Sequence, residues 1–177
     1  MRWPTSLFVI VTIALVAYLG VGSASAEQER VRMTLITPDG IGATIGTIHL
    51  VDTRLGLRLT PLLKSLDPGA HGAGIHENAD CGPGPVDGIN AAGGAAGRSI
   101  DPNDASTPKG TADTTRHDEL PLFTVGNDGI ARTAVTVENL KLAQLKGRTI
   151  VIYALGGAKS GAATPSDGAR VACGIVQ

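Results

Sequence analysis

Gly69-Ala70-His71-Gly72-Ala73-Gly74-Ile75-His76-Glu77-Asn78-Ala79-Asp80-Cys81 is the stretch that decides the fold, and it places two histidines, an acid and a cysteine in a glycine-rich run. So many glycines disfavour a helix and suit an extended strand whose backbone approaches another group closely. His71 and His76 are an odd number of positions apart, so a regular strand directs them to opposite faces. Only one of them then faces a given site, and we expect the other to be structural.

The N-terminus has the pattern of a secretory signal peptide. Arg2 is a short basic head, Leu7 to Val21 is almost wholly apolar, and Ala24-Ser25-Ala26 is a small-residue cleavage site. The apolar run is short for a membrane span, although an uncleaved anchor is the alternative. We expect a signal peptide over residues 1–26 and one domain over residues 27–177. The mature protein would be periplasmic or secreted, with no membrane association after cleavage.

The charge balance argues against several classes of partner. The chain has 15 basic and 16 acidic residues, a formal net charge of −1 at pH 7, and no run of like charges. Nucleic acids and anionic membranes attract strongly basic patches. Neither is therefore expected as a partner.

The two cysteines, Cys81 and Cys173, predict a single disulfide, because an exported chain matures in an oxidising compartment. The alternative is two unpaired buried thiols. A bridge over so long a loop constrains the unfolded chain by roughly 4 to 5 kcal/mol at most. The predicted disulfide would therefore be a major contribution to stability.

Short apolar runs separated by turn residues predict an all-β domain. Val31 to Ile36 alternates apolar and polar side chains, as a half-buried strand does, and Pro38-Asp39-Gly40 follows as a turn. Only Glu138 to Lys146 has a pattern compatible with a turn or two of helix. Strands of this kind between Gly, Pro and Asp turns predict a β-sandwich or barrel. Further strands are expected at Ala43 to Val51, Leu55 to Leu63, around His71, at Thr149 to Leu155 (a central strand) and at Ala169 to Val176.

Two long segments interrupt this pattern of strands. From Gly82 to Asp118 the chain is rich in Gly, Ala, Asp, Thr and Pro and shows no strand pattern, and loops of that length are usually functional or disordered. Gly156 to Gly168 is a second loop. Between them, Leu122 to Val125 and Ala131 to Val137 flank a Gly-Asn-Asp-Gly sequence, which predicts a hairpin.

A series of short motifs follows in order along the segment after the signal peptide. They are Gly40-Ile41-Gly42, Gly46-Thr47-Ile48, Gly69-Ala70-His71-Gly72, Ile75-His76-Glu77-Asn78, Cys81, Ala92-Gly93-Gly94, Leu120-Pro121, Val125, Leu140-Lys141-Leu142, Lys146-Gly147-Arg148 and Gly168-Ala169-Arg170-Val171-Ala172-Cys173-Gly174-Ile175-Val176. Together they resemble the bacterial periplasmic copper/zinc superoxide dismutases over nearly all of the mature chain. The resemblance implies a Greek-key β-sandwich or barrel with long loops. It also implies the Cys81–Cys173 bridge and is the sole basis for expecting a homodimer.

The resemblance implies a copper site of four histidines, but most of these positions carry other residues here. The family's first copper histidine falls on Gly74, and its second falls on His76, which is retained. The bridging histidine falls on Ser99 and the fourth falls on Tyr153. Copper that cycles between two oxidation states needs several imidazoles in a fixed geometry, which one histidine cannot supply. We therefore expect the copper site to be lost.

The zinc site that the resemblance implies is eroded in the same way. Its two histidines fall near Gly110 and Arg116, and its aspartate falls on Glu119. A shift of a few residues in this loop would bring His117 to a zinc position. No cofactor is expected, and copper and zinc would be bound only if the family's function survives.

Three further residues have expected roles or positions. His71 matches a histidine that braces the family's site through hydrogen bonds to the backbone. Arg170 matches the arginine that guides small anions, so it is the one catalytic candidate, with a small anion as its expected ligand. The alternative for Arg170 is a surface residue or a loop-bracing donor. His49 is expected to face solvent.

These observations leave three hypotheses for function. The first, which the lost ligands favour, is an exported dismutase-like protein without useful activity and with a binding or structural role at the cell envelope. The second is a divergent metal-dependent dismutase, converting superoxide to oxygen and hydrogen peroxide, with a site built from His71, His76, Glu77 and His117. The third is a protein that binds copper or zinc weakly. The sequence thus favours a non-enzyme.

Overall fold

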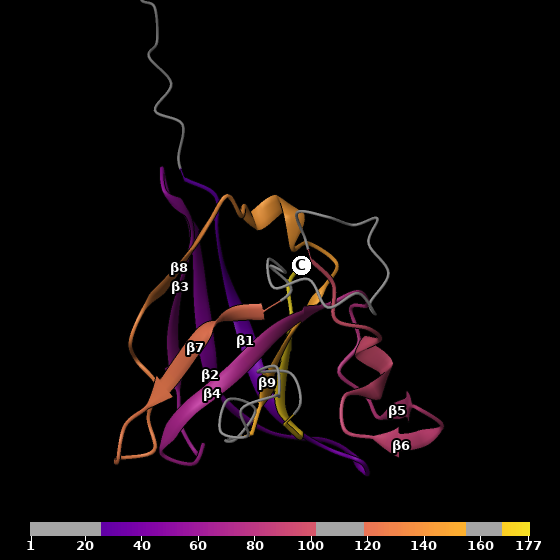
Figure 1. Ribbon diagram of the computed structural model, residues 1–177. Helices are drawn as coiled ribbons and strands as arrows, with labels where there is room; N and C mark the ends of the chain where they lie inside the picture. The colour runs from indigo at the N-terminus through magenta and orange to yellow at the C-terminus, as the bar shows by residue number, and fades with distance from the viewer. Residues whose placement is uncertain (1–25, 102–118, 155–167) are drawn as a thin grey trace, which may run out of the picture.

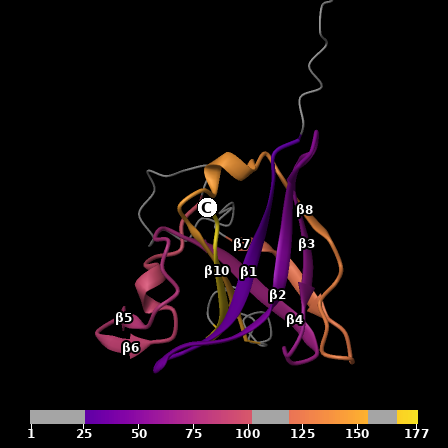
Figure 2. The same ribbon diagram turned by 180° about the vertical axis from the view of Figure 1, so that it is seen from behind.

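The computed structural model describes residues 26–101, 119–154 and 168–177. Eight strands form one antiparallel sheet that curls into a nearly closed barrel (Figures 1 and 2), in the order β7-β4-β9-β10-β1-β2-β3-β8. This confirms the all-β Greek-key barrel that the sequence predicted. The strands are β1 (Gln28–Thr37), β2 (Gly40–Asp52), β3 (Gly56–Leu63), β4 (Gly69–His76), β7 (Glu119–Val125), β8 (Val135–Glu138), β9 (Thr149–Tyr153) and β10 (Arg170–Ile175).

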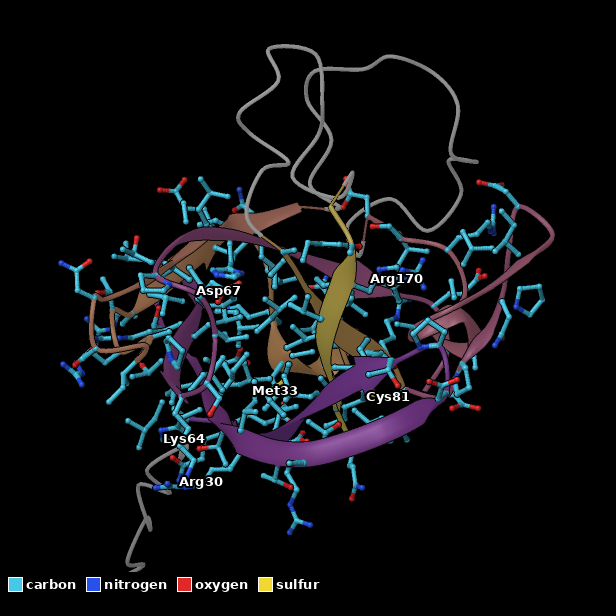
Figure 3. The ribbon with its side chains drawn as sticks, turned by 90° about the horizontal axis from the view of Figure 1, so that it is seen from below. Arg30, Met33, Lys64, Asp67, Cys81 and Arg170 are labelled. Carbon is cyan, nitrogen blue, oxygen red and sulfur yellow. A yellow bond between two sulfur atoms is a disulfide. The ribbon has the colours of Figure 1, made fainter. Side chains whose placement is uncertain are left out.

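The barrel core lies inside the curled sheet, and alternate residues of each strand face it. On β1, Val31 and Met33 are buried, whereas Arg30 and Arg32 are exposed. Figure 3 shows Met33 within the ring of strands and Arg30 at its periphery. β9 is buried along its whole length between β4 and β10, which confirms the prediction of a central strand.

The two edge strands, β7 and β8, meet at a seam. Ala131 bridges both Val125 at the end of β7 and Leu63 at the end of β3. The turn between Val125 and Ala131 forms as predicted, with the Gly129 N–H donating to the Gly126 carbonyl at 2.9 Å. Ala131 thus connects β7, at one end of the strand order, with β3, next to the other end.

The predicted hairpin is wrong beyond Ala131, because β8 pairs with β3 and not with β7. Val137 lies opposite Leu57, and Val135 lies opposite Leu59. Both valines pack against the barrel core from this position. Burial of these apolar side chains favours the long-range pairing over a local one.

A small hairpin lies to one side of the barrel (Figure 1), in a segment for which the sequence predicted no strands. It consists of β5 (Gly84–Val86) and β6 (Ile89–Ala91), and the 3-10 turn η1 (Gly94–Ala96) follows. Asp87 and Gly88 connect the strands with φ angles of 50° and 80°. A two-residue Asp-Gly turn with positive φ at both positions matches the twist of a hairpin. This turn is a local sequence signal for the hairpin.

The Cys81–Cys173 disulfide ties the chain before this hairpin to β10, which confirms the predicted bridge. Cys173 pairs with Val151 of β9, and both belong to a second apolar cluster that is separate from the barrel core. The residues before and after Val151 and Cys173 on their own strands face the barrel core, so this cluster lies on the outer face of the sheet. Its members are Ile36, Cys81, Ala96, Val151, Tyr153 and Cys173, and we call it the outer cluster.

Helical structure is confined to short 3-10 turns in the part of the chain that is described. The stretch predicted to form a turn or two of helix contains η2 (Leu142–Gln144), whose Leu142 is buried. In the described ranges, no helix is both long enough and apolar enough to cross a membrane. The predicted signal peptide and the predicted loop Gly156 to Gly168 lie outside these ranges, apart from the last residue of each.

Candidate functional site

β4 presents its two histidines to different faces of the sheet, as their odd spacing predicted. Ala73, two positions after His71, belongs to the barrel core. Gly74, two positions before His76, pairs with Val151 of the outer cluster. His71 therefore lies on the inner face and His76 on the outer one.

His76 is hydrogen-bonded at both ring nitrogens. Its Nδ1 lies 2.9 Å from the Gly97 carbonyl oxygen, and its Nε2 lies 2.7 Å from the Tyr153 hydroxyl. Because a carbonyl oxygen only accepts, Nδ1 carries the ring proton, and Nε2 of the neutral ring accepts a hydrogen bond from Tyr153. His76 is 1% exposed and Tyr153 is 2% exposed. The tyrosine hydroxyl therefore engages the lone pair with which this histidine would bind a metal ion.

His71 connects β9 to the loop before β4. Its Nδ1 lies 2.8 Å from the Tyr153 carbonyl oxygen, and its Nε2 lies 2.8 Å from the Asp67 carbonyl oxygen. Both partners are carbonyl oxygens, which only accept, so the ring acts as the hydrogen-bond donor. The buried ring thus ties two backbone segments together and has both nitrogens engaged.

Arg170 begins β10 and pairs across the sheet with Tyr153. Its guanidinium donates to the Gly93 carbonyl at 2.7 Å and to the Gly97 carbonyl at 3.3 Å. Figure 3 shows Arg170 on the side of the barrel that carries the β5–β6 hairpin. The Gly97 carbonyl therefore accepts hydrogen bonds from both His76 and Arg170. These contacts brace the loop, and a role for Arg170 in anion guidance stays a prediction.

Ser99 and Glu77 hold the segment after η1 against the end of β4. Ser99 forms an isolated β-bridge with His76 and is buried. The Glu77 carboxylate accepts hydrogen bonds from the Arg98 backbone N–H at 3.1 Å and from the Arg98 guanidinium at 3.2 Å. The backbone hydrogen bond, and then the guanidinium, lower the pKa of Glu77 from its ordinary value. Glu77 is therefore an anionic anchor for this segment.

The four positions that the resemblance assigned to copper lie together. Gly74 and His76 share one face of β4, Ser99 bridges to His76, and Tyr153 donates to it. Only one of the four is a histidine, and its Nε2 is engaged by a phenol. Within residues 26–101, 119–154 and 168–177, no group of three or more His, Cys, Asp or Glu is arranged to hold a metal ion. The donors at these positions do not fit copper.

The zinc positions are described only in part. Gly110, Arg116 and the neighbouring His117 lie outside the described residues. Glu119 is the first residue of β7, and its backbone pairs with β4. The predicted loss of zinc therefore stays a prediction. His49, which was expected to face solvent, lies on β2 and makes a hydrogen bond at the exposed surface.

Sequence reasoning missed Gly97, whose carbonyl orients both His76 and Arg170. This glycine has a φ of 78° and a ψ of −150°, a conformation that other residues rarely adopt. A Cβ at this position would lie 2.7 Å from a carboxylate oxygen of Glu77. The glycine-rich sequence indicated an unusual backbone, but no local pattern shows which carbonyl faces which side chain.

Comparisons with known proteins converge on one family. The family model for copper/zinc superoxide dismutase matches residues 44–176. Superoxide dismutase [Cu-Zn] 2 of Salmonella typhimurium is 38% identical over 169 residues, which cover 94% of this chain and 98% of that protein. Superoxide dismutase [Cu-Zn] of Escherichia coli is 34% identical over the same shares of the two chains. The solved structure of the Cu/Zn superoxide dismutase from Brucella abortus superposes with a TM-score of 0.73 at 32% identity, covering 85% of this chain and 100% of that one.

Proposed function

Because the chain belongs to the copper/zinc superoxide dismutase family, we propose that it is an exported dismutase-like protein that has lost its copper and zinc sites. Its role would be binding or structural, at the cell envelope. The observation that carries this proposal is the 2.7 Å hydrogen bond from the Tyr153 hydroxyl to His76 Nε2. It engages the single imidazole at the four positions where the family holds copper.

The chemistry of the other three positions supports the same conclusion. Gly74 offers no side-chain donor, and Ser99 offers a neutral hydroxyl, which is a weak ligand for copper. The phenol of Tyr153 would have to lose its proton to bind a metal ion tightly, and here that proton bonds to His76. Displacing this bond would leave one nitrogen and at most one phenolate, too few to support redox cycling.

The proposed location rests on the N-terminal sequence and on the disulfide. An apolar run followed by Ala24-Ser25-Ala26 directs export, and the Cys81–Cys173 bridge suits an oxidising compartment. A homodimer and a small anion near Arg170 are further proposals that the family resemblance suggests. Because the guanidinium already donates to two carbonyls, an anion there would have to compete with the loop.

Metal analysis of the protein over residues 27–177, after loading with copper and zinc, tests the proposal beside a superoxide dismutation assay. We expect copper well below one ion per chain and no dismutation above the buffer. The triple variant Gly74→His, Ser99→His, Tyr153→His restores four imidazoles and serves as the positive control for copper binding. Stoichiometric copper with rapid turnover in the unaltered protein would overturn the proposal and support the divergent dismutase.

A titration with either ion separates the remaining alternative. A protein that handles metal weakly would bind copper or zinc with a dissociation constant below about 1 mM, about 4 kcal/mol of binding free energy. No binding at that level excludes metal handling. Binding that survives Tyr153→Phe and His76→Leu would place the metal elsewhere in the chain.

A further inference from the structure

Tyr153 is the only tyrosine in residues 27–177, and that segment has no tryptophan. Its one other aromatic side chain is Phe123, which lies in the barrel core. Phenols and indoles are the aromatic side chains that give up an electron most readily, and phenylalanine does so with much greater difficulty. A one-electron oxidant that reaches the aromatic side chains of the mature protein would therefore act at a single position.

The phenol of Tyr153 faces a base that is ready to take its proton. The Tyr153 Oη lies 2.7 Å from His76 Nε2, within the range required for direct proton transfer. The Gly97 carbonyl fixes the tautomer, because it accepts from Nδ1 and so leaves the Nε2 lone pair facing the phenol. The two ring planes are tilted by 44° with centroids 6.2 Å apart, so the rings meet through this hydrogen bond and do not stack.

Proton transfer leaves the two hydrogen bonds described above in place. Before oxidation, Tyr153 donates to Nε2, and His76 donates through Nδ1 to Gly97. Afterwards the imidazolium would donate through both nitrogens, to the phenoxyl oxygen and to the same carbonyl. In a buried site, a proton with no acceptor would leave an isolated charge at high cost.

The surrounding charges partly favour the state after proton transfer, in which His76 is an imidazolium. The backbone hydrogen bond from Arg98 is the largest cause of the lowered pKa of Glu77, so this residue, next to His76 in the chain, is a carboxylate that would attract an imidazolium at His76. The Arg170 guanidinium shares the Gly97 carbonyl with His76 and opposes a charge on it. Burial of Tyr153 to 2% exposure keeps its oxygen from coupling to a tyrosine of a second molecule.

We propose that Tyr153 and His76 form a proton-coupled redox site, at which the tyrosine reduces one-electron oxidants such as peroxyl radicals. The electron leaves Tyr153 for the oxidant, and the phenolic proton moves from Oη to His76 Nε2. A peroxyl radical becomes a peroxide anion, which takes a proton from solvent. A soluble one-electron reductant such as ascorbate then returns an electron to the phenoxyl, and the proton moves back from Nε2.

This inference rests on the proposed function, because a metal ion on His76 would remove the proton acceptor. The two are tested separately. Metal content is measured on the loaded protein as described above, whereas the redox experiment uses protein over residues 27–177 dialysed against a chelator. If the redox experiment fails in metal-free protein, the proposed loss of the metal sites is unaffected. If the loaded protein binds copper, the redox result for metal-free protein is likewise unaffected.

The experiment oxidises the metal-free protein with a photogenerated ruthenium(III) tris-bipyridine complex and detects the product by freeze-quench EPR. We expect a tyrosyl radical in the unaltered protein and none in Tyr153→Phe. In His76→Leu we expect oxidation to slow about tenfold, which corresponds to about 1.4 kcal/mol in the barrier. His49→Gln, which removes a histidine at the exposed surface, is the matched control and should leave the rate unchanged.

Two outcomes of the oxidation experiment would overturn the inference. One is the absence of a tyrosyl signal in the unaltered protein. The other is an oxidation rate that neither His76→Leu nor heavy water changes. ENDOR on the unaltered protein tests the site without any substitution, should His76→Leu fold poorly. We expect an exchangeable proton hydrogen-bonded to the phenoxyl oxygen, and its absence would exclude His76 as the acceptor.

Discussion

Replacing Tyr153 by phenylalanine measures the hydrogen bond on which both proposals depend. The variant keeps the ring that packs in the outer cluster and removes only the hydroxyl that donates to His76 at 2.7 Å. A buried acceptor that loses its donor costs about 1–3 kcal/mol of unfolding free energy. A change of tautomer cannot compensate, because Nδ1 must keep its proton for the Gly97 carbonyl. We expect the free energy of unfolding to fall by about 2 kcal/mol.

Urea unfolding of residues 27–177, followed by far-UV circular dichroism, measures this loss. Intrinsic fluorescence is unsuitable, because the substitution removes the only tyrosine of that segment and the segment has no tryptophan. With a slope of about 2 kcal/mol per molar urea, the midpoint should fall by about 1 M. Thr37→Ala, which removes an exposed hydrogen bond to the Gly40 carbonyl, is the control and should change stability by less than about 0.5 kcal/mol.

A double-mutant cycle separates the hydrogen bond from the other contacts of the two side chains. His76→Leu is combined with Tyr153→Phe. The interaction energy is the difference between the loss of unfolding free energy in the double variant and the sum of the losses in the two single variants. We expect a coupling of about 1–3 kcal/mol. A coupling near zero, with a Tyr153→Phe midpoint equal to that of the unaltered protein, would refute the reasoning.

Three other substitutions have predictable outcomes. Replacing both cysteines by serine removes a cross-link over 92 positions and should lower the free energy of unfolding by up to about 4.7 kcal/mol, as measured by urea titration; an unchanged midpoint would contradict this. Glu77→Gln removes a carboxylate whose pKa lies below its ordinary value of 4.5 because of hydrogen bonds from Arg98. The stabilisation by this carboxylate is present above pH 4.5 and is lost as the pH falls through the folded-state pKa. The difference in unfolding free energy between the unaltered protein and Glu77→Gln should therefore narrow in acid. A difference that does not depend on pH would contradict this prediction. Gly94→Ala would drive a Cβ into the backbone oxygen of Gly84 in β5 and should cost about 1–3 kcal/mol in urea unfolding. Gly42→Ala meets only ordinary contacts at 3.4 Å and is the control, so equal losses would contradict the packing.

Local sequence patterns predicted most of the barrel. Alternation on β1 and the apolar, β-branched run of β9 placed these strands, because burial on one or both faces imposes a recognisable pattern. The pairing of β8 with β3 was not predictable in the same way. The turn after Val125 favours a local partner, and only the three-dimensional arrangement shows that Val135 and Val137 pack against the barrel core beside β3. The β5–β6 hairpin is different, since the local Asp87-Gly88 sequence, with positive φ at both positions, is enough to predict it.

The candidate site was predictable in composition but not in its contacts. The resemblance identified Gly74, Ser99 and Tyr153 as positions without an imidazole, and the structure brings them beside His76. Nothing in the sequence indicates that Tyr153 donates to His76, because these residues are 77 positions apart. Contacts of that kind depend on strand register, which requires the whole sheet.

The separation between barrel core and outer cluster has a consequence for how such a protein can diverge. On β4 and β9, residues that face inward fill the barrel, while their immediate neighbours face outward. Replacing an outward residue leaves the inward packing as it was, since the two sets share a backbone but not a surface. The reactive chemistry of this scaffold can therefore be rewritten by single codon changes without a matching series of compensations in the interior. Tyr153, whose carbonyl accepts from His71 and whose hydroxyl donates to His76, occupies such an outward position.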